Sequence, residues 1–98
     1  MRIIHHPEAT AELTEAGRFY EDRVAGLGGQ FLDAADEAVQ VISASPTQWR
    51  IIEGDVRRYL MPRFPYAIYY RLFSDHIRIL AFKHHSRHPA YWRQRIST

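Results

Sequence analysis

The first half of the chain repeats apolar residues with the period of an α-helix. A short apolar strand at residues 2–5 is closed by Pro7, and apolar side chains then recur every three or four positions. Proline is tolerated in the first helical turn, so we expect a helix to begin here, with Glu12, Glu15 and Arg18 turned away from its apolar stripe. The stripe consists of Ala9, Leu13, Ala16, Tyr20 and Val24.

A second helical stripe follows a break at Gly26, Gly28 and Gly29. It consists of Phe31, Ala35, Ala38 and Ile42, widened by Leu32 and Val39. Ser45-Pro46 ends it, because the residue before a proline avoids the helical conformation. Two amphipathic helices joined by a glycine turn predict a helical hairpin with one face to bury.

In the second half the period changes to two, which is typical of strands. Ser74-Asp75 marks a hairpin turn, and Pro89 begins a short terminal helix. The predicted strands are residues 56–61, 66–73 and 76–83, with an edge segment at 49–52. The pattern predicts an α+β fold: an N-terminal strand, a helical hairpin packed on one face of a small antiparallel-rich sheet, and a short C-terminal helix.

Length and composition exclude several classes of protein. At 98 residues the chain is expected to form one domain, residues 1–98. It has no cysteine, which excludes disulfides, a thiolate nucleophile and cysteine metal ligands. No apolar run approaches the roughly 20 residues of a membrane span, and no signal-peptide pattern opens the chain. We therefore expect a cytoplasmic protein with no membrane association.

The net charge of +2 hides a strong asymmetry. Residues 1–48 carry three arginines and eight acids, a net charge of −5, whereas residues 49–98 carry nine arginines and Lys83 against three acids, a net charge of +7. Arginine favours planar, bidentate recognition of phosphate or carboxylate. The asymmetry predicts a basic working face backed by acidic helices, although a solvated surface with incidental imbalance would look the same.

Two segments in the basic half carry a family resemblance. They are Arg-Phe-Pro-Tyr-Ala-Ile-Tyr-Tyr-Arg at 63–71 and the ending His84-x-x-Arg87-x-Pro89-x-x-Trp92. With the order of elements, they resemble toxins of the RelE/ParE superfamily of type II toxin–antitoxin systems, over nearly the whole chain and most specifically over 57–93. The resemblance implies a compact α+β toxin without a cofactor, held inactive by a cognate antitoxin. Such a pair represses its own operator DNA through the antitoxin.

The superfamily has two branches with different targets. One cleaves mRNA in the ribosomal A site without a metal; the other, which this sequence resembles more closely, poisons DNA gyrase without hydrolysis. The nuclease branch carries a basic residue within a Tyr-Arg-x-x-Tyr stretch, and the matching position here is Ala67. This absence favours a gyrase-directed toxin over an mRNA endonuclease. A family member that binds its antitoxin with little toxicity is a third possibility.

The nuclease alternative needs a base, an acid and a cation for the phosphorane. The candidate residues are His84, His85, Arg87, Tyr91 and Arg71, with Arg57 or Arg58 as other replacements for the missing cation. Paired histidines at a strand end are also common as plain surface groups. A metal site at His84, His85 and His88 lacks an acidic or cysteine fourth ligand nearby in sequence, so no metal is expected.

The binding alternative asks for charge and rigid contact area, which arginines and aromatic residues supply at interfaces. Phe64, Tyr66, Tyr70 and Phe82 are expected in the core instead. Arg71 and Arg87 could also pair with acids of the helical hairpin, and Trp92 could pack the terminal helix onto the sheet. The predicted partner-binding residues are Arg57, Arg58, Arg63, Tyr69, Arg71, Arg87, Tyr91, Trp92 and Arg93.

Overall fold

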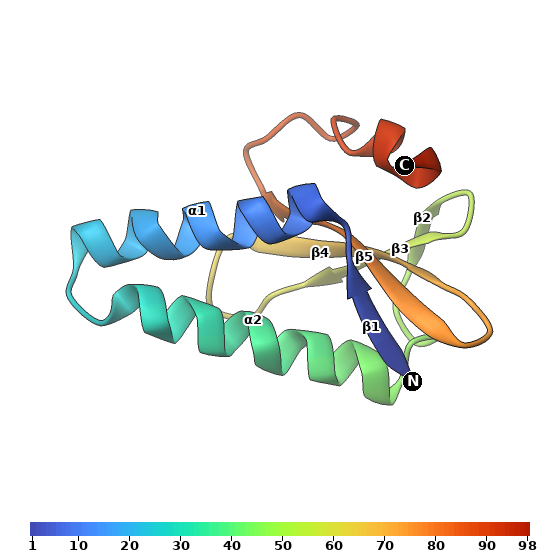
Figure 1. Ribbon diagram of the computed structural model, residues 1–98, viewed down its shortest axis with the longest axis horizontal. Coiled ribbons are helices and arrows are strands. Elements are labelled where there is room, and N and C mark those ends of the chain that lie inside the picture. Colours follow the sequence, from blue (N-terminus) through green and yellow to red (C-terminus); the bar gives the residue numbers. More distant parts are fainter.

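A computed structural model describes all 98 residues as two helices, five strands and a terminal 3-10 helix. The elements in chain order are β1 (Arg2–His5), α1 (Pro7–Arg23), α2 (Leu27–Ala44), β2 (Ile51–Glu53), β3 (Val56–Leu60), β4 (Tyr66–Leu72), β5 (His76–His84) and the 3-10 helix η1 (Arg93–Ser97). Figure 1 shows α1 and α2 lying side by side, with the C-terminal segment returning to the start of α1.

The five strands form one mixed sheet in the order β1-β5-β4-β3-β2. β1 pairs with β5 in parallel, and the other three pairings are antiparallel. Between β4 and β5 the register shifts, because Tyr69 lies opposite Ala81 whereas Tyr70 lies opposite Ile79. A shift of this kind is a β-bulge, and it increases the local twist of the two central strands.

The helical hairpin is held at both of its helix starts. His6 caps α1, its ring Nδ1 accepting a hydrogen bond from the backbone N–H of Glu8 at 3.1 Å. Gly26, with a φ of 86°, turns the chain into α2 in a conformation that favours glycine. The Glu21 carboxylate accepts from the N–H groups of Gly26 and Gly28 at 2.8 and 3.0 Å. It thereby satisfies free donors at the start of α2.

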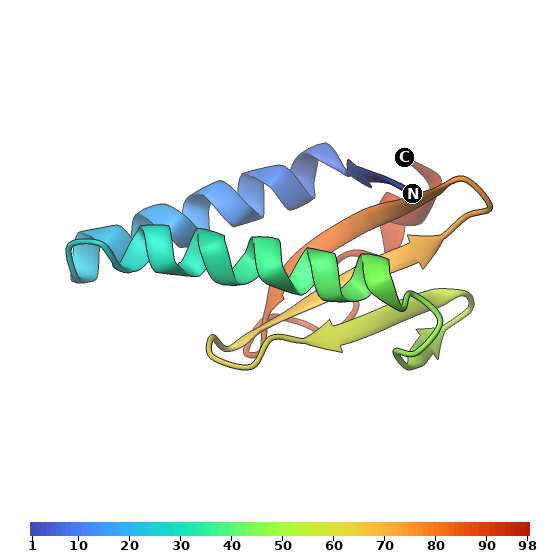
Figure 2. The same cartoon turned by 90° about the horizontal axis from the view of Figure 1, so that it is seen from below.

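The helices cover one face of the sheet, as the view from below shows (Figure 2). The stripe predicted for α2 is confirmed: Phe31, Ala35, Ala38 and Ile42 are all buried. They join a core of sheet residues that includes Ile68, Tyr70, Ile77, Ile79 and Phe82. The prediction that Phe64, Tyr70 and Phe82 lie in the core is confirmed, and Tyr66 packs against it partly buried.

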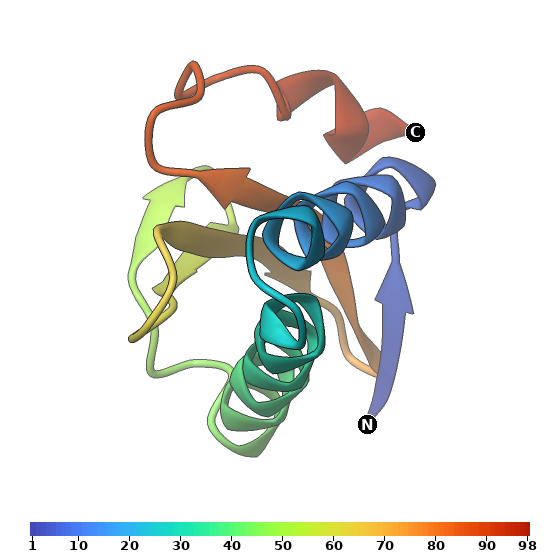
Figure 3. The same cartoon turned by 90° about the vertical axis from the view of Figure 1, so that its left-hand side faces the viewer.

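The other face of the sheet has a smaller core, covered by the C-terminal segment. Val56, Ala67, Tyr69, Leu80 and Ala81 are buried there. The cover comes from Trp92, which is 1% exposed, with Tyr91 and Ile96 beside it. Seen end-on, the C-terminal segment and α2 lie on opposite sides of the sheet (Figure 3). The packing role expected for Trp92 is therefore what the structure shows.

The predicted α+β architecture is confirmed, with three local corrections. The regular terminal helix begins at Arg93, not at Pro89, and is a 3-10 helix. Val24 is 58% exposed because α1 ends at Arg23 and Val24 itself is extended. Leu32, expected to widen the α2 stripe, is 43% exposed. The first two corrections lie at helix ends, where sequence periodicity is least informative.

None of the helices has the length and apolar character required to cross a membrane.

Candidate functional site

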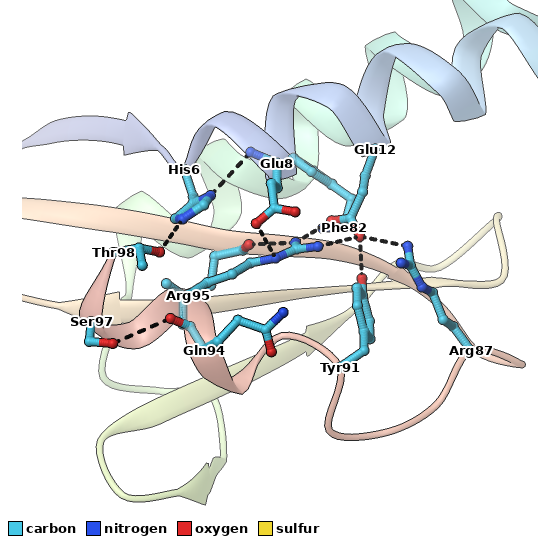
Figure 4. A network of polar contacts seen from close by, with 11 residues as sticks. His6, Glu8, Glu12, Phe82, Arg87, Tyr91, Gln94, Arg95, Ser97 and Thr98 are labelled. Atoms are coloured by element: carbon cyan, nitrogen blue, oxygen red, sulfur yellow. Dashed lines mark hydrogen bonds and ion pairs between the residues drawn. The ribbon is translucent and has the colours of Figure 1, made fainter.

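A network of polar contacts centred on Glu12 joins the C-terminal segment to α1 (Figure 4). The carboxylate Oε1 accepts from the backbone N–H of Phe82 at 3.1 Å and from Arg95 Nη1 at 2.8 Å. Oε2 accepts from Arg87 Nη1 at 3.0 Å, from Arg95 Nη2 at 3.2 Å and from the Tyr91 hydroxyl. One nearly buried carboxylate thus holds three side chains that follow the last strand.

Arg95 is the most buried cation of the network, at 3% exposure. Its Nη1 also donates to the carbonyl oxygen of Leu80 at 3.0 Å, and its Nε lies 3.6 Å from Glu8 Oε2. A buried guanidinium is tolerated when it is paired with a carboxylate and hydrogen-bonded. Arg95 therefore fastens η1 to both α1 and β5.

Arg87 and Tyr91, two of the predicted site residues, are engaged by this network. The Arg87 guanidinium lies 3.8 Å from the centroid of the Tyr91 ring, a cation–π contact. Burial, reinforced by the hydrogen bond to Glu12, raises the pKa of the Tyr91 phenol. The phenol is therefore held as a hydrogen-bond donor. The alternative in which Arg87 pairs with an acid of the helical hairpin is confirmed, the acid being Glu12.

Of His84, His85 and His88, the first and the last have separate local partners. Nδ1 of His84 accepts from the N–H of Ser86 at 3.0 Å, and its ring meets that of Tyr66 edge-on at 5.1 Å. Nδ1 of His88 accepts from the N–H of Ala90 at 3.1 Å, while His85 is exposed. In the whole chain, no three His, Asp or Glu side chains gather closely enough to hold a metal ion.

Arg71 lies away from the other candidate nuclease residues. Tyr66, at the start of β4, pairs with His84, whereas Arg71 is near the other end of the same strand and pairs with Arg78. Its guanidinium binds the Asp55 carboxylate at 2.9 and 3.0 Å and thereby lowers the pKa of that carboxyl. Asp55 belongs to the turn between β2 and β3, so the alternative in which Arg71 pairs with an acid of the helical hairpin is wrong.

Three more of the predicted contact arginines have intramolecular partners. Arg57 Nη1 donates to the carbonyls of Thr47 and Trp49, on the helix side of the sheet, at 3.0 and 2.8 Å. Arg63 Nη2 donates to Gln30 Oε1 at 3.1 Å, and Arg93 binds Glu53 at 2.7 Å. Neighbouring strand residues face opposite sides, so Arg57 and Arg58 do not share a surface.

Tyr69 and Trp92, expected to offer contact area, are buried at 4% and 1% exposure. Their rings pack against each other at 5.1 Å, and the Trp92 indole N–H donates to the Pro89 carbonyl at 2.8 Å. Both aromatic rings are therefore occupied inside the protein. The packing of Trp92 is one of the two roles expected for it. The burial of Tyr69 could not be predicted, because the cover of its sheet face comes from the end of the chain.

The far face of the sheet has a hollow of about 280 Å³. Its lining residues are Arg58, Leu60, Ala67, Tyr69, Lys83 and His85. Neither Arg58 nor Lys83 forms an ion pair with a carboxylate of the chain. Burial lowers the pKa of Lys83, and the charges of Arg58 and Arg87 lower it further. We call this opening the far-face hollow.

Sequence reasoning missed Glu12, Arg95 and Lys83. Glu12 was expected to turn away from the core, yet its side chain is only 10% exposed. Lys83 was counted as part of a central strand without a role of its own. Of the three, only Lys83 could have been found from the sequence. It ends a strand that is otherwise apolar, and a lysine is seldom buried without a reason.

The fold and part of the sequence are shared with known proteins. Residues 3–89 match the family described as ParE toxin of type II toxin–antitoxin system, parDE. A solved structure titled "Chromosomal ParDE TA system from P. aeruginosa" superposes with a TM-score of 0.64 at 22% identity, covering 86% of this chain and 95% of that one. A comparison with curated proteins found no significant match. The chain belongs to the ParE toxin family of type II toxin–antitoxin systems.

Proposed function

We propose that this protein is a toxin that inhibits DNA gyrase by binding it, without hydrolysing a substrate, and that a cognate antitoxin neutralises it. Membership in the ParE family supports the toxin role and implies an antitoxin partner. The gyrase target follows from the resemblance of the chain to the gyrase-directed branch of its superfamily. The cytoplasm, where gyrase works, is the compartment that this proposal requires.

One observation carries the choice of a binding toxin over a nuclease: three of the groups that a nuclease would use, Arg87, Tyr91 and Arg71, are held by other residues of the chain. Arg87 and Tyr91 both donate to Glu12, and a phenol with a raised pKa is a poor proton carrier near neutral pH. Arg71 lies toward the other end of β4, bound to Asp55. At Ala67 the strand has no side chain long enough to reach a phosphate.

The test is gyrase supercoiling by the purified protein, run beside a translation reaction in which mRNA ends are mapped. We expect supercoiling to stop, cleaved DNA to accumulate on gyrase, and mRNA to stay intact. Addition of the antitoxin should restore supercoiling. Cuts at fixed codon positions, with gyrase unaffected, would contradict the proposal.

The alternative is a metal-independent mRNA endonuclease that acts on the ribosome. It is favoured by the placement of His84, His85, Arg87 and Tyr91 in one segment of the chain. His85 lines the far-face hollow, whereas His84 and Arg87 line a separate hollow beside Glu12. In that case His85, which is exposed and forms no side-chain hydrogen bond in the structure, is the residue free to take a proton. His85→Gln should then abolish mRNA cleavage while the protein stays folded, and it should leave gyrase inhibition unchanged if gyrase is the target.

A further inference from the structure

The far-face hollow is a place where positive charge converges over a small side chain. Arg58 lies opposite Tyr69 on β4, and Lys83 lies opposite Ala67 on the other side of the same strand. Strand spacing and rise place the Cα atoms of Arg58 and Lys83 about 12 Å apart, diagonally across β4. Ala67 fills little of the space between them, and it is buried at 2% exposure. The two long cationic side chains therefore border a hollow whose floor is apolar.

The charge in this hollow is uncompensated within the chain. Lys83 is 6% exposed, and the single hydrogen bond of its Nζ goes to the carbonyl oxygen of His84 at 3.1 Å. An ammonium group has three donors, so Lys83 has donors left for a ligand. The other strongly buried cation of the chain, Arg95, forms an ion pair with the Glu12 carboxylate. A buried cation without one indicates that an anion from outside completes the site.

We propose that the far-face hollow receives one carboxylate side chain, a glutamate or aspartate, of the cognate antitoxin. This inference rests on the proposed function, in which an antitoxin covers part of the basic face. In the complex the carboxylate accepts from the Arg58 guanidinium and the Lys83 ammonium together. The antitoxin thereby supplies a carboxylate to Arg58 and Lys83, as Glu12 of the same chain does for Arg87 and Arg95.

The walls of the hollow favour an acidic side chain over a nucleic-acid phosphate. Leu60, Ala67 and Tyr69 provide apolar surface beside the two cations. A glutamate or aspartate has a methylene stem for that surface and a carboxylate for the cations, whereas a phosphodiester is polar on all sides. The partner implied by the family is also a protein. Arg57, which faces the helix side, plays no part in this contact.

The experiment measures antitoxin affinity at low salt for Lys83→Met and Arg58→Gln, with Arg18→Gln as matched control. Methionine keeps the unbranched shape and most of the length of lysine without its charge. Arg58→Gln, at a half-buried position, serves if Lys83→Met does not fold. Arg18 is exposed on α1, away from the hollow. We expect both hollow variants to bind the antitoxin at least about tenfold more weakly, or 1.4 kcal/mol. The control should bind like the wild type.

A double-mutant cycle then identifies the carboxylate. Each acidic residue of the antitoxin is changed to its amide, and one of these changes should cost at least about tenfold against the wild type and almost nothing against Lys83→Met. Wild-type affinity of both hollow variants overturns the inference while the toxin–antitoxin function stands. Loss of binding to a single-stranded RNA oligonucleotide, with antitoxin affinity unchanged, overturns it and assigns the hollow to phosphate. A wild-type protein that fails to bind the antitoxin overturns both proposals.

Discussion

Glu12 is the residue on which the second half of the chain depends most. Three side chains from residues 87–95 and one backbone N–H from β5 donate to its two oxygens. Its side chain is 10% exposed and that of its main partner, Arg95, is 4% exposed. An ion pair this buried adds little stability compared with apolar residues, but removing one partner leaves an uncompensated buried charge. Glu12 therefore orders the C-terminal segment as a single unit.

The substitution Glu12→Gln tests this role. We expect it to lower the free energy of unfolding by about 3–5 kcal/mol, because Arg95 would remain charged and buried with only the longer contact to Glu8, at 3.6 Å, as an ion pair. Urea unfolding measures the change, and amide hydrogen exchange shows whether residues 87–98 open first. Glu15→Gln, one turn away on the exposed side of α1, should change stability by less than about 0.5 kcal/mol. Equal effects of the two variants would contradict the role.

His6 makes the stability of the protein depend on pH. Its Nδ1 accepts from the N–H of Glu8, its Nε2 bonds with the Thr98 hydroxyl at 2.8 Å, and the side chain must therefore be neutral. Burial lowers the pKa of His6, and the charges of Arg78 and Arg95 lower it further. The unfolded chain takes up a proton near pH 6.5 while the folded chain does not, so stability is full above that pH and falls below it.

Urea unfolding at about pH 7.5 and about pH 5 measures this loss. His6→Asn keeps a side chain that can cap α1, so we expect it to reduce the loss without removing the cap. His85→Asn, at an exposed position, should leave the loss as it is in the wild type. If the loss in His6→Asn equals that of the wild type, His6 is not its source.

At the scale of elements, the close packing of α1 against α2 depends on Gly28, which has no side chain. A Cβ added at Gly28 would lie 2.8 Å from the Glu21 Cβ and closer still to the backbone of Gly17. At Gly29 an added Cβ would meet nothing within 4 Å. The two adjacent glycines thus differ, since Gly28 permits the helices to approach whereas Gly29, in the first turn of α2, faces open space.

Replacing each glycine by alanine tests this difference. Gly28→Ala should destabilise the protein by about 1–3 kcal/mol, because the clash is with backbone and with the first atom of a side chain. Gly29→Ala should stabilise it by as much as about 1 kcal/mol through its higher helix propensity. Thermal unfolding of the two variants is the measurement. Gly28→Ala and Gly29→Ala variants of equal stability would contradict the packing argument.

At the scale of the whole molecule, the sheet lies between two unequal covers. The helical hairpin covers one face, and residues 89–98 cover part of the other through Trp92. This second cover leaves the far-face hollow open beyond it. The protein therefore has three layers where this segment covers the sheet and two layers beyond it, with Arg58 and Lys83 in the open part.

Adjacent residues of the C-terminal segment test the second cover. Trp92→Ala should cost about 3–5 kcal/mol, since the indole is 1% exposed against Tyr69 and its neighbours. Arg93→Ala removes an exposed ion pair with Glu53 and should cost about 0–1 kcal/mol. Urea unfolding compares the two. A Trp92→Ala variant as stable as Arg93→Ala would mean that the sheet face does not need this cover.

Most of the elements could be predicted from local pattern. The buried stripe of α2, the hairpin of β4 and β5 and the strand ends need only spacing, glycine and proline, which act over a few residues. The candidate site was harder, because its residues are brought together by contacts spanning most of the chain. Glu12 and Arg95 are 83 positions apart, and no periodicity relates them.

The sequence by itself determined the α+β class, the helical hairpin, the family and the uneven distribution of charge. Each of these is encoded in neighbouring residues or in short motifs. Only the tertiary structure decided which cations are free. It paired Arg71, Arg87, Arg93 and Arg95 with carboxylates, turned Arg57 toward the helices, and left Arg58 and Lys83 facing an opening over Ala67. The physical reason is that a charge is neutralised by what lies beside it in space, and long-range packing alone sets those neighbours.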